Sequence, residues 1–184
     1  QTDEPITILA TGALTNLAQA LRLDPDITEN IAAVYIMGGA VNVPGNLNDL
    51  VPDTENTFAE WNIYADPLAA SEVFNSGLNL YLVPLDATNS IQVNANDIAQ
   101  WRKGGNIPDF AADIYDSLMK AWGVDEVEMW DLVTAEIMMN PEHCTFTPLA
   151  LEVVIEEGQT EGQTRVIEGA ANLNVCLDPD EEAI

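Results

Sequence analysis

The sequence predicts an α/β fold: an open, mainly parallel sheet flanked by helices, with a partly antiparallel C-terminal β portion. Two observations lead to this prediction. Over residues 6–139, short apolar stretches alternate with stretches of helical periodicity, which is typical of a parallel sheet with helical crossovers. After residue 139, strand-like stretches follow one another without a helical pattern between them, which favours antiparallel pairing.

The first strand is predicted at residues 6–10 (ITILA) and the second at residues 32–37 (AAVYIM), which ends at Gly38-Gly39 as a buried strand does. A helix is expected between them, because apolar residues recur at helical spacing. The apolar stripe consists of Leu14, Leu17, Ala18 and Leu21. A long loop rich in Asn, Asp, Pro and Gly then runs to Glu60.

Residues 60–64 (EWNIY) alternate in polarity, so we expect an extended backbone that places Glu60 and Asn62 on the same side. Asp66 suits an N-cap and Pro67 the first helical position, which predicts a helix over residues 67–74.

The rest of the chain continues the alternation and then becomes β-rich. A strand is predicted at 80–85, and helices are predicted at 94–102, 108–122 and 130–139. The last strands are predicted at 150–156, 163–167 and 172–177. With no internal repeat and no clear boundary, we expect residues 1–184 to belong to one α/β domain.

Polar residues follow the predicted strands. In open α/β sheets, ligands bind beyond the carboxyl ends of the strands, so Thr11, the loop 38–60 and Asp86 are expected to face one crevice. Asn46, Glu60 and Asn62 offer the amide and carboxylate groups that a polyhydroxylated ligand requires. The alternative for each of them is an ordinary turn or surface residue.

The chain is strongly acidic, with 31 Asp and Glu against 5 Lys and Arg and a net charge of −26. Nucleic-acid binding is therefore disfavoured, because phosphate contacts need clusters of basic residues. No apolar run approaches the roughly 20 residues that span a bilayer, so no membrane association is expected. The acidity fits either an ordinary solvated surface or adaptation to high salt, which screens the repulsion.

Cys144 and Cys176 are far apart in sequence and form no CxxC motif. This spacing argues against a structural zinc site. We expect two separate, buried or partly buried thiols.

Several segments together resemble the inosine–uridine-type nucleoside hydrolase family, in the family's order. These segments are residues 8–18 (ILATGALTNLA), 37–70, 83–88 (VPLDAT), 129–135 (MWDLVTA) and the tail GQTEGQTRV followed by NLNVCLDPD. The resemblance implies an enzyme that hydrolyses the N-glycosidic bond of a small-molecule ribonucleoside with the help of Ca²⁺. It also implies a homo-oligomer.

The resemblance assigns roles to individual residues. It makes the backbone carbonyl of Thr11 and the carboxylate of Asp131 ligands of Ca²⁺; without it, Thr11 would be part of a tight turn and Asp131 a helix cap. It makes Asn46, Glu60 and Asn62 ribose-binding residues. It also places Met37 against the sugar, where simple core packing is the alternative.

Trp130 departs from the family's usual pattern, because many members carry His before the late aspartate. Tryptophan cannot supply a titratable proton to the leaving base. The resemblance instead implies that the Trp130 ring stacks on the base and that the enzyme prefers purine nucleosides. The alternative is a tryptophan buried in a helix face.

The family's N-terminal DxDxxxDD motif, which supplies the catalytic base and most calcium-binding carboxylates, does not occur in this sequence. We therefore expect the C-terminal two-thirds of an enzyme, inactive by itself. The competing hypothesis is a non-catalytic protein, either a pseudoenzyme or a calcium-dependent ribose- or nucleoside-binding module. The sequence does not predict the compartment.

Overall fold

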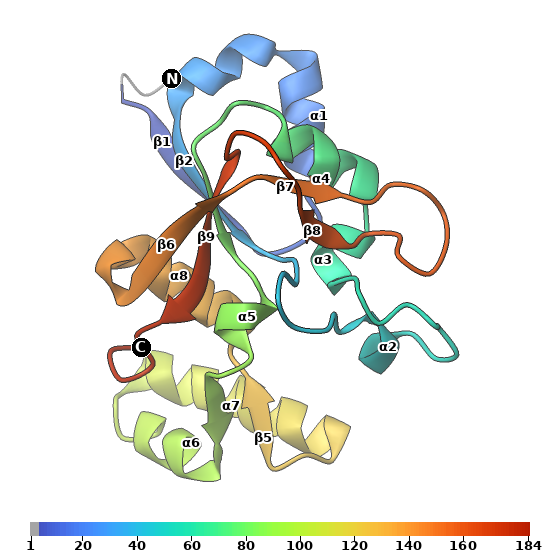
Figure 1. Cartoon of the computed structure of the whole chain (residues 1–184). Helices are drawn as coiled ribbons and strands as arrows, with labels where there is room; N and C mark the ends of the chain where they lie inside the picture. Colours follow the sequence, from blue (N-terminus) through green and yellow to red (C-terminus); the bar gives the residue numbers. More distant parts are fainter. Residues whose placement is uncertain (1–3) are drawn as a thin grey trace.

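The computed structural model describes residues 4–184. Its main sheet has the strand order β1-β2-β3-β9-β6 (Figure 1). The strands are β1 (Ile6–Ala10), β2 (Ile31–Met37), β3 (Leu80–Val83), β9 (Leu173–Pro179) and β6 (Cys144–Leu149). β1, β2, β3 and β9 run parallel to one another, and β6 runs antiparallel to β9. The predicted α/β class is confirmed.

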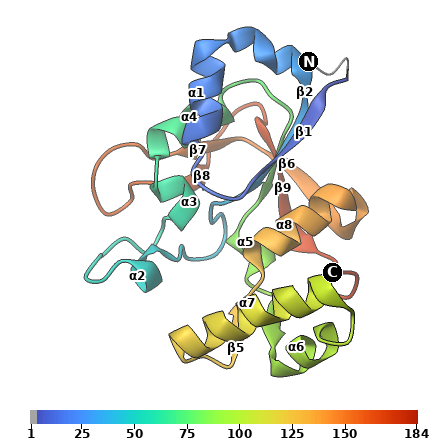
Figure 2. The same cartoon turned by 180° about the vertical axis from the view of Figure 1, so that it is seen from behind.

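Helices cover both faces of this sheet. α1 (Thr15–Leu23) and α4 (Pro67–Phe74) pack together on one face, and α8 (Trp130–Met139) lies across the other, as Figure 2 shows from behind. The helix predicted at 67–74 is confirmed, and its Asp66 cap accepts a hydrogen bond from the Ala69 N–H at 3.0 Å.

The strands divide their side chains between two cores. In β2, Val34 and Ile36 join the core under α1 and α4, whereas Ala33 and Tyr35 join the core under α8. This alternation follows from the two-residue period of a strand. It explains the continuous apolar sequence of β2, because a strand buried on both faces has no polar side.

A smaller layer lies beside the carboxyl ends of the main sheet (Figure 1). It consists of β4 (Gln92–Asn94), α6 (Ala95–Trp101), α7 (Asn106–Trp122) and β5 (Glu126–Glu128), with β4 antiparallel to β5. Arg102 ties α6 to α7 through Asp109, Asp113 and Asp116 at 3.0, 2.8 and 3.4 Å.

The remaining elements are short. They are the 3-10 helices η1 (Pro25–Asn30) and η2 (Pro141–His143), the helices α2 (Leu47–Leu50), α3 (Trp61–Tyr64) and α5 (Leu85–Thr88), and the antiparallel pair β7 (Leu151–Val153) and β8 (Thr164–Val166). Within residues 4–184 no helix is both long and apolar enough to cross a bilayer.

Two local predictions are wrong, and one strand was not predicted. Residues 61–64 are not extended but form α3, because the Glu60 side chain accepts the N–H groups at its start. The strand predicted at 80–85 stops at Val83, after which α5 begins. β6 was not predicted at all; its residues CTFTPL are mostly polar or partly exposed because it is an edge strand.

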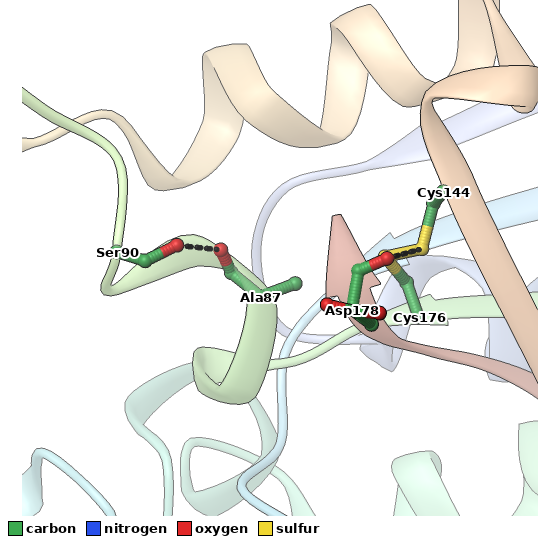
Figure 3. The surroundings of a disulfide bond; sticks show 5 residues. All are labelled: Ala87, Ser90, Cys144, Cys176 and Asp178. Carbon is green, nitrogen blue, oxygen red and sulfur yellow. Dashed lines mark hydrogen bonds between the residues drawn. A yellow bond between two sulfur atoms is a disulfide. The ribbon is translucent and has the colours of Figure 1, made fainter. Parts of the chain in front are cut away.

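The prediction of two separate thiols is also wrong. Cys144 on β6 and Cys176 on β9 form a disulfide with a Cα–Cα distance of 5.9 Å (Figure 3). The antiparallel pairing of these strands, which the sequence did not reveal, brings the two residues together. Both are buried, and Cys144 Sγ lies 3.6 Å from the Asp178 carbonyl oxygen.

Reduction of this disulfide is expected to destabilise the fold. A cross-link between residues 32 positions apart restricts the unfolded chain, and such a bond contributes about 2–4 kcal/mol. Thermal unfolding with and without dithiothreitol should show a lower Tm in the reduced protein. The Cys144→Ala/Cys176→Ala variant is the control, because its Tm should not respond to the reductant. Two freely labelled thiols in the unreduced, denatured protein would contradict the cross-link.

Candidate functional site

The carboxyl ends of β1, β2 and β3 meet at one edge of the sheet, because these strands are parallel. Thr11 follows β1, Gly38 follows β2 and Asp86 lies just beyond β3 in α5. The segment 38–42, which we call the glycine loop, leaves β2 at this edge.

Four consecutive backbone N–H groups of the glycine loop donate to side chains from three distant segments. The bonds are Gly39 N–H to Glu60 Oε2 (3.0 Å), Ala40 N–H to Thr164 Oγ1 (3.0 Å), Val41 N–H to Asp86 Oδ2 (2.8 Å) and Asn42 N–H to Asp86 Oδ1 (2.7 Å). The Thr164 hydroxyl also donates to the Ala40 carbonyl at 2.8 Å. A loop whose donors are all satisfied in this way is held in one conformation.

Glu60 is the most buried charged residue of the site, with 2% of its surface exposed. Besides Gly39, it accepts the N–H groups of Asn62 (2.9 Å) and Ile63 (3.1 Å) and so caps α3. Burial raises the pKa of Glu60, the three backbone donors lower it, and the Asp131 charge raises it; the net pKa shift is upward. An ionised carboxylate offers about four acceptor positions, and the three backbone donors occupy three of them.

Asn62 is anchored beside Glu60. Its Nδ2 donates to the Met37 carbonyl at 3.1 Å and lies 3.3 Å from the Met37 sulfur. Because a carbonyl oxygen only accepts, this bond fixes the orientation of the amide. The Asn62 side-chain oxygen therefore faces away from Met37, which is itself buried.

Asn46 joins the same arrangement from the long loop. Its Oδ1 accepts the Trp61 N–H at 2.9 Å, next to the donors that Glu60 binds. The preceding Gly45 is pressed against Ala59, so closely that a Cβ atom at Gly45 would lie 2.0 Å from the Ala59 carbonyl oxygen. The predicted trio Asn46, Glu60 and Asn62 is thus brought together around the start of α3.

A cavity of about 650 Å³ opens at this edge of the molecule. It is lined by Pro44, Gly45, Asn46, Asp49, Leu50, Asn89, Trp122, Glu128 and Trp130. Asn46 and Trp130 share this cavity, whereas Met37, Glu60 and Asn62 are not among its lining residues. Two aromatic rings, amide groups and carboxylates suit a flat polar ligand.

Trp130 opens α8 and is half-buried. It packs against a small cluster formed by Met37, Ala40 and Leu85, and its indole N–H donates to Asn89 Oδ1 at 3.1 Å. Sequence reasoning did not single out Asn89, although it follows a predicted strand as Asp86 does. Thr164 was also missed, and nothing near it in the sequence indicates its contact with the glycine loop.

The two predicted metal ligands are placed differently. Asp131 is exposed, yet desolvation by the neighbouring protein raises the pKa of its carboxyl group. The negative charge of Asp131 also raises the pKa of Glu60. Thr11 is exposed and lines a separate cavity of about 510 Å³ between β1 and α1. Among residues 4–184, no group of three or more His, Cys, Asp and Glu side chains could hold a metal ion.

Comparison with known proteins adds an independent line of evidence. The sequence model of the family described as "Inosine-uridine preferring nucleoside hydrolase" matches residues 1–184. The pyrimidine-specific ribonucleoside hydrolase RihA of Klebsiella pneumoniae (strain 342) is 33% identical and is matched over 100% of this chain and 60% of its own length. RihA of Salmonella schwarzengrund is 34% identical over 99% of this chain and 59% of its own.

Solved structures agree in fold. An inosine-uridine preferring nucleoside hydrolase from Bacillus anthracis has a TM-score of 0.84 and 28% identity, over 99% of this chain and 58% of that chain. A purine-preferring ribonucleoside hydrolase from Gardnerella vaginalis has a TM-score of 0.83 and 27% identity, over 96% and 57%. The chain thus spans about 60% of the length of the relatives that it matches.

Proposed function

This chain belongs to the family of inosine-uridine preferring nucleoside hydrolases, and from this premise we propose that its whole protein hydrolyses the N-glycosidic bond of ribonucleosides to ribose and free base. The observation that carries the proposal is the placement of Trp130 and Asn46 in one cavity, beside a glycine loop bound by Glu60. An aromatic ring and polar side chains in one cavity match the flat base and the polar sugar of a nucleoside.

We assign the sugar to the neighbourhood of Asn46, Glu60 and Asn62. Asn46 and Asn62 would hold ribose hydroxyls through their amides, Glu60 through its one remaining acceptor position, and Met37 would pack behind the sugar. Cleavage gives the sugar oxocarbenium character. Charge at Glu60 and Asp131, which already interact, would stabilise this positive charge more than the neutral ground state.

The two predicted ligands account for only part of a calcium site. The Thr11 carbonyl and the Asp131 carboxylate are hard oxygen donors of the kind that Ca²⁺ binds, but the ion takes 6–8 oxygens. The described residues contain no cluster of three acidic ligands. When bound, the ion would lower the pKa of a water molecule. A complete site needs oxygens beyond these two, so we also propose that residues 1–184 alone are inactive.

The whole protein is expected to release ribose from inosine and uridine in a reducing-sugar assay with added calcium, at about 1–1000 turnovers per second. Asn62→Ala should lower kcat/KM roughly 5- to 100-fold, because a hydrogen bond to substrate is lost. Asn96→Ala, an exposed asparagine on α6, is the matched control and should keep full activity. Nucleoside binding without any ribose release would favour the alternative, a binding module.

The base preference is part of the same proposal. Stacking on Trp130 favours purines, because a bicyclic base offers more contact area, and stacking contributes roughly 1–3 kcal/mol per base. The names of the relatives point both ways, since RihA is pyrimidine-specific and the Gardnerella vaginalis enzyme purine-preferring. A kcat/KM for inosine about tenfold above that for uridine is the expected result. Equal kcat/KM values for the two substrates, or a higher value for uridine, would contradict the proposed purine preference.

A further inference from the structure

Asn89 holds the one polar atom of the Trp130 side chain. The indole Nε1–H donates to Asn89 Oδ1 at 3.1 Å, and both residues line the same cavity. The Trp130 side chain packs against the cluster of Met37, Ala40 and Leu85. The Trp130 side chain is thus held both by this packing and by the hydrogen bond to Asn89, and it also lines the cavity.

The chemistry of the pair leaves no ambiguity in the orientation of the amide. An indole N–H only donates, so the Asn89 atom that faces it must be the oxygen. The Asn89 backbone is anchored at the end of α5, where its N–H donates to the Leu85 carbonyl at 3.1 Å. The hydroxyl of Ser90 closes the same turn by donating to the Ala87 carbonyl at 3.2 Å (Figure 3).

We propose that Asn89 is a positioning residue, which fixes the plane of the Trp130 ring so that it receives the base; this rests on the proposed function. A tryptophan side chain has two rotatable bonds, and packing at its root restrains mainly the first. A hydrogen bond at Nε1 restrains the second and hence the tilt of the ring. A stacking surface that is already oriented costs less ordering on binding than a mobile one.

The proposal requires that Asn89 acts through the indole N–H. Asn89→Leu is expected to lower kcat/KM for inosine and uridine roughly three- to tenfold, the value of one neutral hydrogen bond. In a Trp130→Phe background, which has no N–H to hold, the same substitution should have no further effect. Asn89→Asp keeps an acceptor oxygen and should recover most of the loss. Asn96→Leu is the matched control.

Two measurements keep this proposal separate from the proposed function. In the protein labelled with ¹⁵N-tryptophan, the indole resonance that disappears in Trp130→Phe belongs to Trp130. Asn89→Leu should shift this resonance and speed its exchange with solvent, whether or not the protein is an enzyme. An unmoved resonance, or an undiminished loss of kcat/KM from Asn89→Leu in the Trp130→Phe background, overturns the positioning role. A moved resonance in a protein that releases no ribose supports the pairing and overturns only the proposed function.

Discussion

Replacing Glu60 with alanine is expected to destabilise the protein by at least about 3 kcal/mol, because three backbone N–H groups lose their acceptor and each unsatisfied group costs at least about 1 kcal/mol. Two of these donors, Gly39 and Ile63, are buried. Urea unfolding followed by circular dichroism measures the effect. In the whole protein, the same substitution should abolish the proposed release of ribose, because the glycine loop and the start of α3 both lose their hydrogen bonds to Glu60.

Glu29→Ala is the control, because Glu29 is an exposed glutamate on η1; it should change the free energy of unfolding by less than about 0.5 kcal/mol. A similarly small effect of Glu60→Ala would show that the glycine loop does not depend on this carboxylate.

The raised pKa of Glu60 adds a dependence on pH. A carboxyl group whose pKa is higher in the folded than in the unfolded protein contributes stability that is complete below its ordinary pKa of 4.5 and is lost as the pH rises through the folded value. The free energy of unfolding of the wild type, relative to that of Glu60→Gln, should therefore fall as the pH rises from about 4.5. A constant difference between the two proteins would contradict the raised pKa.

Gly45→Ala is the second substitution with a large expected effect. The added Cβ atom would lie 2.0 Å from the Ala59 carbonyl oxygen and 2.7 Å from its nitrogen. The two backbone segments must separate, which breaks the bonds from Gly45 N–H to Thr57 O (2.9 Å) and from Leu47 N–H to Ala59 O (3.3 Å). We expect a cost of about 3 kcal/mol, measured as a lower urea midpoint, and weaker substrate binding because Asn46 moves as well.

Gly12→Ala is the matched control for Gly45→Ala. A Cβ atom at Gly12 has no heavy atom within 4 Å, so stability should stay the same or rise slightly as the unfolded chain loses entropy. If both variants unfold at the same urea concentration as the wild type, the loop at Gly45 accommodates the added Cβ atom and the predicted destabilisation is contradicted.

The elements predicted well from the sequence are those whose signal is local. β1, α4 and α8 have the predicted bounds, because an apolar run, an Asp-Pro start or a helical pattern is contained in each segment. Residues 61–64 were wrong because their alternation fits a strand, while the actual determinant is the Glu60 side chain folding back onto the following N–H groups.

The candidate site could also be predicted only where its signal is local in the sequence. Asn46, Glu60 and Asn62 do cluster around the start of α3, and Asp86 does face the loop that follows β2. Their roles toward a ligand stay predictions. The contact of Thr164 with the glycine loop depends on the packing of β8 against the sheet edge, and the Cys144–Cys176 bond depends on the pairing of β6 with β9; neither leaves a pattern in nearby residues.

The bonds of the glycine loop imply an order of events during synthesis of the chain. Glu60 lies 21 positions after its partner and Asp86 lies 45 and 44 positions after its two, but Thr164 lies 124 positions after Ala40. A chain emerging from the ribosome can therefore form the bonds at both ends of the loop long before it can form the bond at Ala40. Contacts between distant residues close last and slowest, so this loop is expected to be among the last parts to become rigid. A nascent chain stalled before Thr164 would carry β2 and α3 but no finished site, and a folding sensor placed at Ala40 would respond only after Thr164 had left the ribosome.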